Sequence, residues 1–260
     1  WQGLEAVFGS YSQDSIANVL VEAGLIIQSE AKRYDRFRDR IMFPIRNTKG
    51  QVIGFGGRVM GAGEPKYLNS PETPLFQKGS ELYGLFEARQ AIRDKGYVLV
   101  AEGYMDVVAL AQFGFEQAVA TLGTACTPIH VQKLLRQTDQ VIFSFDGDAA
   151  GRRAARRALE ACLQHASDSR TLKFLFLPKE HDPDSYIREH GHEAFEKFVA
   201  SIPISEAFSF IISAKASSEP AIPSANATHA SLPEAIMIPF NKSSTDTSSL
   251  TIINIDEYPL

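Results

Sequence analysis

The pattern of hydrophobic and polar positions divides this chain into two regions. Between residues 97 and 185, short apolar runs predict buried strands at 97–101, 118–120, 141–145 and 172–177. Segments of helical period separate these runs, and we expect helices at about 105–113, 128–136 and 151–164. Strand and helix alternation with short connections predicts an α/β fold, with a mostly parallel sheet flanked by helices.

The residues before this region have a different pattern. An amphipathic helix is expected at 11–23, and a second helix at 87–95 that ends at a glycine. The runs at 41–46 and 52–59 are separated by a turn around Lys49 and Gly50, which predicts an antiparallel hairpin. A smaller α+β subdomain therefore precedes the predicted sheet.

Acidic side chains follow three of the predicted strands. Glu102 follows the strand at 97–101. Asp146 and Asp148 flank a glycine directly after the strand at 141–145, and Asp182 and Asp184 follow the strand at 172–177. The carboxyl ends of parallel strands meet at one edge, so these carboxylates are expected to converge there. Their mutual repulsion favours a divalent cation with oxygen ligands. The alternative is that the aspartates only cap helices, and Asp182 before a proline suits that role.

Charge is unevenly distributed along the chain. The formal net charge is −5, yet residues 32–58 hold an excess of basic side chains over two aspartates. The basic side chains are Lys32, Arg33, Arg36, Arg38, Arg40, Arg46, Lys49 and Arg58. Such an excess indicates either a phosphate-binding surface or a solvated charged face, and we favour the first.

Composition sets further limits. The chain has 260 residues, of which 44% are hydrophobic and 22% charged, as in soluble globular proteins. The two cysteines, Cys126 and Cys162, lack CxxC spacing, which excludes a thiolate zinc site within the chain and favours a reducing cytoplasm. No apolar run has the length of a membrane span. His181, His190 and His192 have no recognisable zinc-ligand spacing and are expected at the surface.

Several sequence segments resemble a known family. EGYMDVVALAQFG from Glu102, SFDGDAAG from Ser144 and DPDS from Asp182 resemble the acidic motifs of the Toprim module. That module is shared by topoisomerases, primases and some nucleases. YDRFRDRIMFPIRNTKGQVIGFGGR and PKYLNSPET resemble bacterial DnaG-type primases more specifically. The resemblance extends from about residue 1 to residue 212.

The resemblance implies RNA primer synthesis during DNA replication, by attack of a ribonucleotide 3′-hydroxyl on the α-phosphate of an incoming NTP. It implies Mg²⁺ or Mn²⁺ as cofactor, with catalytic roles for Glu102, Asp146 and Asp148 and further metal ligands at Asp182 and Asp184. It also implies that template or nucleotide is contacted by Arg36, Arg58, Lys66, Lys78 and Asp106. The implied partners are single-stranded DNA, NTPs and the RNA primer, in the cytoplasm at bacterial replication forks and without a membrane.

The resemblance also implies a division of the chain. We expect an incomplete basic subdomain at 1–95, the Toprim domain at 96–185, the start of a helical subdomain at 186–212, and an atypical flexible tail at 213–260. Family members also have an N-terminal zinc-binding domain and a C-terminal domain that binds the replicative helicase, and neither is expected here. The alternatives are another Toprim enzyme, either a topoisomerase or a nuclease, or an inactive fragment that still binds nucleic acid.

Overall fold

The computed structural model describes residues 3–30, 32–167 and 169–201, which lie in a compact unit that spans residues 1–219. The predicted tail at 213–260 and residues 202–212 of the predicted helical segment lie outside the described residues, whereas residues 186–201 are described. Within the described ranges, no helix is both long and apolar enough to cross a bilayer.

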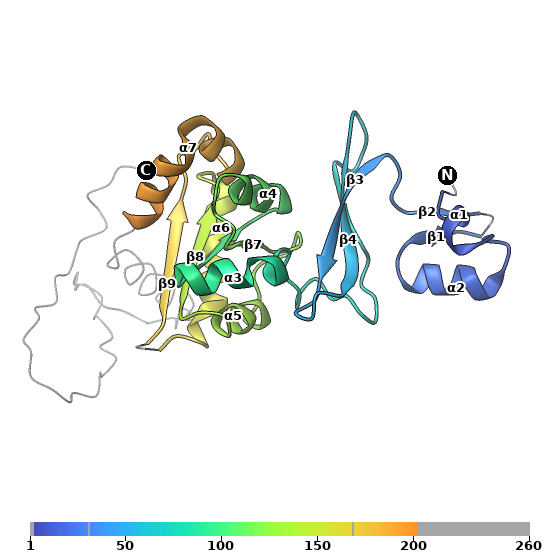
Figure 1. Cartoon of the computed structure of the whole chain (residues 1–260), viewed down its shortest axis with the longest axis horizontal. Coiled ribbons are helices and arrows are strands. Elements are labelled where there is room, and N and C mark those ends of the chain that lie inside the picture. Colours follow the sequence, from blue (N-terminus) through green and yellow to red (C-terminus); the bar gives the residue numbers. More distant parts are fainter. Residues whose placement is uncertain (1–2, 31, 168, 202–260) are drawn as a thin grey trace, which may run out of the picture. The chain divides into compact units, whose positions relative to one another are not determined.

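The described elements are named as in Figure 1. The helices are α1 (Glu5–Phe8), α2 (Asp14–Glu22), α3 (Leu85–Lys95), α4 (Tyr104–Gln112), α5 (Pro128–Leu135), α6 (Ala149–Leu163) and α7 (Pro183–Ala200). The strands are β1 (Ile26–Gln28), β2 (Arg33–Asp35), β3 (Arg40–Arg46), β4 (Val52–Val59), β5 (Tyr67–Asn69), β6 (Val98–Ala101), β7 (Ala118–Ala120), β8 (Gln140–Phe145) and β9 (Thr171–Phe176).

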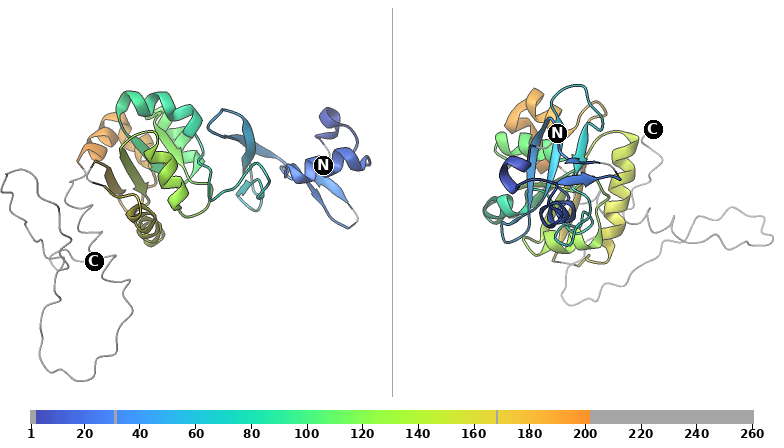
Figure 2. Two further views of the ribbon diagram at one scale, coloured as in Figure 1. Left: turned by 90° about the horizontal axis from the view of Figure 1, so that it is seen from below. Right: turned by 90° about the vertical axis from the view of Figure 1, so that its right-hand side faces the viewer.

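The largest sheet contains four parallel strands in the order β7-β6-β8-β9. Helices cover both of its faces, as Figure 2 shows. Buried residues of α3, α5 and α6 share one apolar cluster with Val98 and Val100, whereas α4 and α7 share another with Leu99 and Ala101. Because both faces are covered, β6 is buried throughout and appears in the sequence as a continuous apolar run. The α/β prediction is confirmed.

The predicted hairpin is also confirmed, as part of a three-stranded antiparallel sheet in the order β3-β4-β5. Two glycines of β4 allow aromatic rings to approach its backbone closely. A Cβ atom at Gly56 would lie 2.9 Å from Cε1 of Tyr104, and one at Gly57 would lie 2.9 Å from Cδ1 of Phe37. These contacts hold α4 and the 36–39 segment against the strand.

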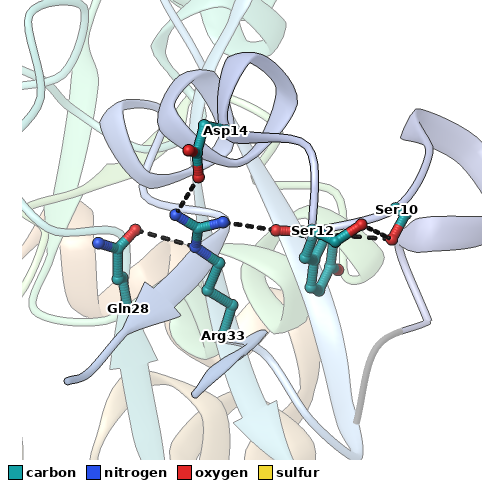
Figure 3. Close-up of polar contacts among 6 residues, drawn as sticks. Ser10, Ser12, Asp14, Gln28 and Arg33 are labelled. Atoms are coloured by element: carbon teal, nitrogen blue, oxygen red, sulfur yellow. Dashed lines mark hydrogen bonds and ion pairs between the residues drawn. The ribbon is translucent and has the colours of Figure 1, made fainter. Parts of the chain in front are cut away.

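The first 35 residues combine α1 and α2 with the two-stranded sheet β1-β2. Arg33 joins them: its guanidinium donates to the carbonyl of Tyr11 at 2.6 Å, to Asp14 at 2.7 Å and to Gln28 at 3.2 Å (Figure 3). The hydroxyl of Tyr11 donates to the buried carboxylate of Asp35. Side-chain hydrogen bonds therefore support a small apolar core in this segment.

Three helices begin two or three residues away from the predicted positions, and α3 does so at Leu85 instead of residue 87. α6 begins at Ala149, before Gly151, because the Asp148 side chain accepts a hydrogen bond from the Gly151 amide at 2.7 Å and caps the helix. α2 begins at Asp14 and not at Tyr11, which is buried in the local core. The short elements α1, β1, β2 and β5 have no counterpart in the prediction.

Candidate active site

Acidic side chains gather where β6, β8 and β9 end. Since these strands are parallel neighbours, the residues that follow them meet at one edge of the sheet. Glu102 follows β6, Asp146 and Asp148 follow β8, and Asp182 lies between β9 and α7. Asp106, in the first turn of α4, completes the group. We call these five residues the acidic edge.

Two glycines make the close approach of these segments possible. A Cβ atom at Gly147 would lie 2.2 Å from the Leu177 carbonyl oxygen, and one at Gly151 would lie 2.1 Å from the Asp146 carbonyl oxygen. Any other residue would force these backbone segments apart. Gly147 thus allows the chain after β9, which leads to Asp182, to lie against the chain after β8.

Asp146 lies at the centre of the acidic edge. Its amide donates to the Glu102 carboxylate, with an N to Oε1 distance of 3.3 Å. Burial raises the pKa of Asp146 to about 6, and repulsion from Glu102, Asp182 and Asp148 adds to this shift. Burial also raises the pKa of Glu102, an effect that the Asp146 amide opposes and the Asp148 charge reinforces. The three segments therefore bring mutually repelling carboxylates together.

Asp106 belongs to the same electrostatic group. Burial raises its pKa to about 7, with further contributions from the charges of Asp182 and Asp146. Its carboxylate accepts a hydrogen bond from the Gly103 amide at 3.0 Å, and the backbone of Asp184 opposes the rise of its pKa. Asp106 thus ties the start of α4 to the start of α7.

Two of the aspartates cap helices, as the sequence also allowed. Asp148 caps α6, and Asp182 caps α7 by accepting a hydrogen bond from the Ser185 amide at 2.7 Å. Both bonds use Oδ1, and the described residues offer no hydrogen bond to either Oδ2. Capping therefore orients these side chains and leaves one oxygen of each available to a ligand.

Asp184 differs from the other predicted metal ligands. Its carboxylate pairs with Arg188 one turn along α7, at 2.5 Å. No pair of this kind with Lys, Arg or His involves the acidic edge within residues 3–30, 32–167 and 169–201. The structure therefore brings Glu102, Asp146, Asp148 and Asp182 together and gives Asp184 a different partner.

The donor set of the acidic edge fits a hard divalent cation. Carboxylate oxygens are the ligands that Mg²⁺ and Mn²⁺ prefer, and a cation would relieve the repulsion described above. The carboxylates are nevertheless spaced more widely than in a closed cage. In the described part of the chain, three ligand atoms come within 4.8 Å of one another only at His181, Glu189 and His190.

Several basic residues of the 32–58 segment have structural partners and do not form an open phosphate surface. Arg33 pairs with Asp14, and Arg46 pairs with Glu87 at 3.2 Å. The Arg40 guanidinium donates to backbone carbonyls on β4 and in the 65–66 turn. The expected cradle is therefore smaller than the sequence excess of charge indicates.

Two arginines remain without polar partners for their Nε atoms. These buried atoms belong to Arg36 and Arg58, and neither has a hydrogen bond within the described residues. Burial lowers the pKa of Arg36. The Arg58 guanidinium carbon lies 6.0 Å from the ring centre of Tyr67, and Lys66 Nζ lies 5.6 Å from the same ring. Unsatisfied guanidinium groups are suited to an incoming anion.

Lys78 occupies a well-fixed loop. Its carbonyl lies 3.0 Å from Nε2 of the buried His130, and its amide donates to Glu72 at 3.1 Å. Thr127 strengthens the attachment, since its hydroxyl donates to the Gly79 carbonyl at 2.7 Å. Lys78 thus lies in a loop that is anchored to the start of α5.

Tyr104 connects the basic residues with the acidic edge, and the sequence analysis did not identify it. It lies two residues after Glu102, and its ring centre is 5.5 Å from that of Tyr67 and 4.7 Å from that of Phe43. Burial raises its pKa to about 12, and the nearby charges of Arg40 and Arg58 oppose the shift. The sequence signal that could have identified it is its position between the two acids of EGYMD, Glu102 and Asp106.

Two half-buried side chains, Asn69 and Thr124, each have one buried polar atom without a partner in the described residues, and both were missed. Asn69 donates to the Leu122 carbonyl at 3.0 Å, but its own Oδ1 accepts nothing from the described residues. The Thr124 hydroxyl is likewise unpaired there and borders a cavity of about 210 Å³ that Glu102 and Arg157 also line. The Thr124 hydroxyl is therefore available to a ligand in the cavity that Glu102 lines.

The histidines differ in part from the expectation that they lie at the surface, and neither cysteine is exposed. His192 is held by the Phe113 carbonyl, 2.7 Å from its Nδ1, and is not a free surface side chain. Cys162 is buried, Cys126 is half-buried, and burial raises the pKa of both thiols, so neither is a reactive thiolate.

Two protein families match this chain. Residues 1–89 match the family described as "DNA primase catalytic core, N-terminal domain", and residues 99–187 match the family described as "Toprim-like". A DNA primase of Neisseria meningitidis is 58% identical over 210 residues, which are 80% of this chain and 35% of the relative. A DNA primase of Escherichia coli is 51% identical over 207 residues, with coverage of 79% and 35%. The chain thus spans about a third of the length of these curated relatives.

Solved structures of the same kind of protein are similar in fold. The RNA polymerase domain of Mycobacterium tuberculosis primase DnaG is 34% identical, with a TM-score of 0.65 and coverage of 77% of this chain and 67% of that chain. The DnaG primase catalytic domain bound to ssDNA is 50% identical, with a TM-score of 0.75 and coverage of 80% and 65%.

Proposed function

The chain belongs to the family of bacterial DnaG-type DNA primases, and we propose that it carries the catalytic residues for RNA primer synthesis on single-stranded DNA. The observation that supports this most strongly is the acidic edge. Its repelling carboxylates have no cationic side chain as partner within the described ranges, and Arg36 and Arg58 each keep an Nε atom without a hydrogen bond there.

We propose Glu102, Asp146 and Asp148 as catalytic metal ligands, with Asp182 as a further ligand. When bound, Mg²⁺ or Mn²⁺ would neutralise charge on the reacting phosphate and activate a hydroxyl. The protein orients these ligands through the Asp148 and Asp182 caps and the glycine contacts. Asp184 is the weakest candidate in this proposal, because its ion pair with Arg188 would have to break before it could bind a metal.

The polynucleotide and the NTP would be held by Arg36, Arg58, Lys66 and Lys78. The unsatisfied Nε atoms of Arg36 and Arg58 support contacts with phosphate oxygens, which guanidinium groups bind strongly. Asp106 is better suited to positioning than to contact with nucleotide, because its carboxylate is buried and already accepts the Gly103 amide. In the reaction, a ribonucleotide 3′-hydroxyl displaces pyrophosphate from the α-phosphate of the NTP and a phosphodiester bond forms.

We further propose that residues 1–95 supply the basic contacts and residues 96–185 the metal site. The segments at 186–212 and 213–260 stay predictions. So do the cytoplasmic location at replication forks and, for full-length relatives, binding to the replicative helicase.

The test is ribonucleotide incorporation by this chain on a single-stranded DNA template with Mg²⁺ or Mn²⁺. Dinucleotide and longer RNA products would support the proposal, whereas DNA nicking or relaxation without RNA products would favour another Toprim enzyme. Salt-dependent DNA binding without any product, unchanged by Asp146→Asn, would identify an inactive nucleic-acid-binding fragment.

A further inference from the structure

A second group of metal-ligand side chains lies near the start of α7, outside the acidic edge. His181 precedes the helix cap, and Glu189 and His190 lie two turns into the helix. The distance from His181 Nε2 to Glu189 Oε2 is 3.9 Å, and that from His190 Nε2 to Glu189 Oε1 is 4.0 Å. One ligand atom of each residue lies within 4.8 Å of the other two.

The two imidazole rings are held in place by neighbouring side chains. His181 Nδ1 lies 3.3 Å from the hydroxyl of Ser185, which fixes the ring and leaves Nε2 directed at Glu189. The ring of Tyr186 lies 5.5 Å from the His181 ring and 4.4 Å from the His190 ring, between centres. Hydrogen bonding of the second imidazole nitrogen is typical of metal-binding histidines.

The donor set determines the class of metal. Two imidazole nitrogens and a carboxylate oxygen suit zinc and similar transition metals, whereas Mg²⁺ prefers oxygen ligands alone. Ligand atoms around a tetrahedral zinc ion are about 3.4 Å apart, given zinc–ligand distances of about 2.1 Å. The two separations that involve the exposed Glu189 would therefore close by less than about 1 Å, and that between the imidazoles by at most about 1.4 Å.

We propose that His181, Glu189 and His190 form a second metal site, specific for a zinc-class divalent transition metal and independent of the acidic edge. Solvent would supply the fourth ligand, because Glu189 and His190 are exposed. The proposal rests on these contacts and not on the proposed primase function.

The site has a structural consequence for α7. Gly191, at φ 80° and ψ 176°, interrupts the helix directly after His190, so the first half of α7 ends at the proposed ligands. His181 lies on the opposite side of the Asp182 cap, and Ser185 bonds to both residues. A bound metal would therefore clip this half-helix to the loop that carries Asp182 and restrain the cap.

The experiment is a titration of the whole chain with Zn²⁺ in the presence of saturating Mg²⁺, followed by calorimetry, with Co²⁺ absorption as a spectroscopic check. We expect one site, with affinity reduced at least about tenfold by Glu189→Gln and by His190→Gln. Glu193→Gln, an exposed acid on the same helix, is the matched control, and Asp146→Asn tests independence from the acidic edge. Both controls are expected to keep wild-type affinity.

Three results would overturn the proposal. These are the absence of zinc binding at 25 °C under these conditions, unchanged affinity in Glu189→Gln and His190→Gln, and loss of the site in Asp146→Asn. Hydrogen exchange provides a second measurement, since zinc should slow exchange at the first-turn amides of α7 in the wild type and not in Glu189→Gln. Both substituted side chains are exposed, so circular dichroism should show an intact fold.

Discussion

The acidic edge and the basic segment 32–58 both concentrate charge of one sign, but the structure treats them differently. Within the described ranges, no carboxylate of the acidic edge has a cationic side chain as partner, and burial and repulsion raise the pKa values of Glu102, Asp106 and Asp146. In the basic segment, Arg33 and Arg46 form ion pairs. Uncompensated charge thus marks the acidic edge as a whole, whereas only part of the basic segment is open to a ligand.

The strongest test of this contrast is removal of one carboxylate. Asp146→Asn should reduce primer synthesis by roughly a thousandfold or more, because Asp146 is central to the proposed metal site. Asp139→Asn is the matched control, since Asp139 is an exposed acid at the opposite end of the same strand. Dinucleotide formation under saturating Mg²⁺ measures the effect. Comparable loss in both variants would contradict a specific role for the acidic edge.

The second test concerns the backbone that brings the carboxylates together. Gly147→Ala places a methyl group 2.2 Å from the Leu177 carbonyl oxygen, so we expect the free energy of unfolding to fall by about 3 kcal/mol. Gly61→Ala serves as the control, since a Cβ atom there meets nothing within 4 Å. Urea denaturation measures both. Equal stability of the two variants would show that the chains after β8 and β9 do not need this close approach.

These two regions also show what the sequence can and cannot reveal. Runs of apolar residues predicted the four parallel strands, because strands buried on both faces carry no alternation to obscure them. Parallel order then predicted that Glu102, Asp146 and Asp182 would meet at one edge. The partners of Arg33 and Arg46 were not predictable, since Asp14 and Glu87 lie far from them in sequence and only folding brings them near.

Other features of the site could be identified only from the three-dimensional structure. Tyr104 was missed because an aromatic residue at a helix start usually indicates core, and its contacts with β3 and β5 arise from tertiary packing. The pairing of Asp184 with Arg188 followed a visible i, i+4 spacing, but that spacing does not tell whether the carboxylate prefers the arginine or a metal.

The third test uses pH to measure the repulsion at the acidic edge. The folded-state pKa values of Asp106 and Asp146, about 7 and about 6, exceed the unfolded value of about 3.9. The folded state therefore binds more protons between these values, and its stability falls as pH rises through 6 to 7. Without metal, we expect a loss of about 1 kcal/mol between pH 5.5 and pH 8, after allowance for solvent screening.

Chemical denaturation at both pH values measures this loss. Asp106→Asn should flatten the dependence, because it removes the group with the highest pKa in the acidic edge. Saturating Mg²⁺ should also restore stability at pH 8, since a cation offsets the repulsion. A dependence that persists in Asp106→Asn and in Mg²⁺ would place the titrating group elsewhere.

The smallest expected effects separate the two kinds of arginine. Arg58→Gln should weaken binding of single-stranded DNA and reduce the slope of log affinity against log salt by about 1, because its unpaired guanidinium is proposed to contact a phosphate. Arg33→Gln should leave that slope unchanged and lower the free energy of unfolding by about 1 kcal/mol, because it loses three hydrogen bonds within the first 35 residues. Fluorescence anisotropy at several salt concentrations and urea denaturation measure the two effects. If Arg33→Gln changed the salt slope as much as Arg58→Gln, hydrogen bonds to the protein would not separate structural arginines from DNA-binding arginines in this segment.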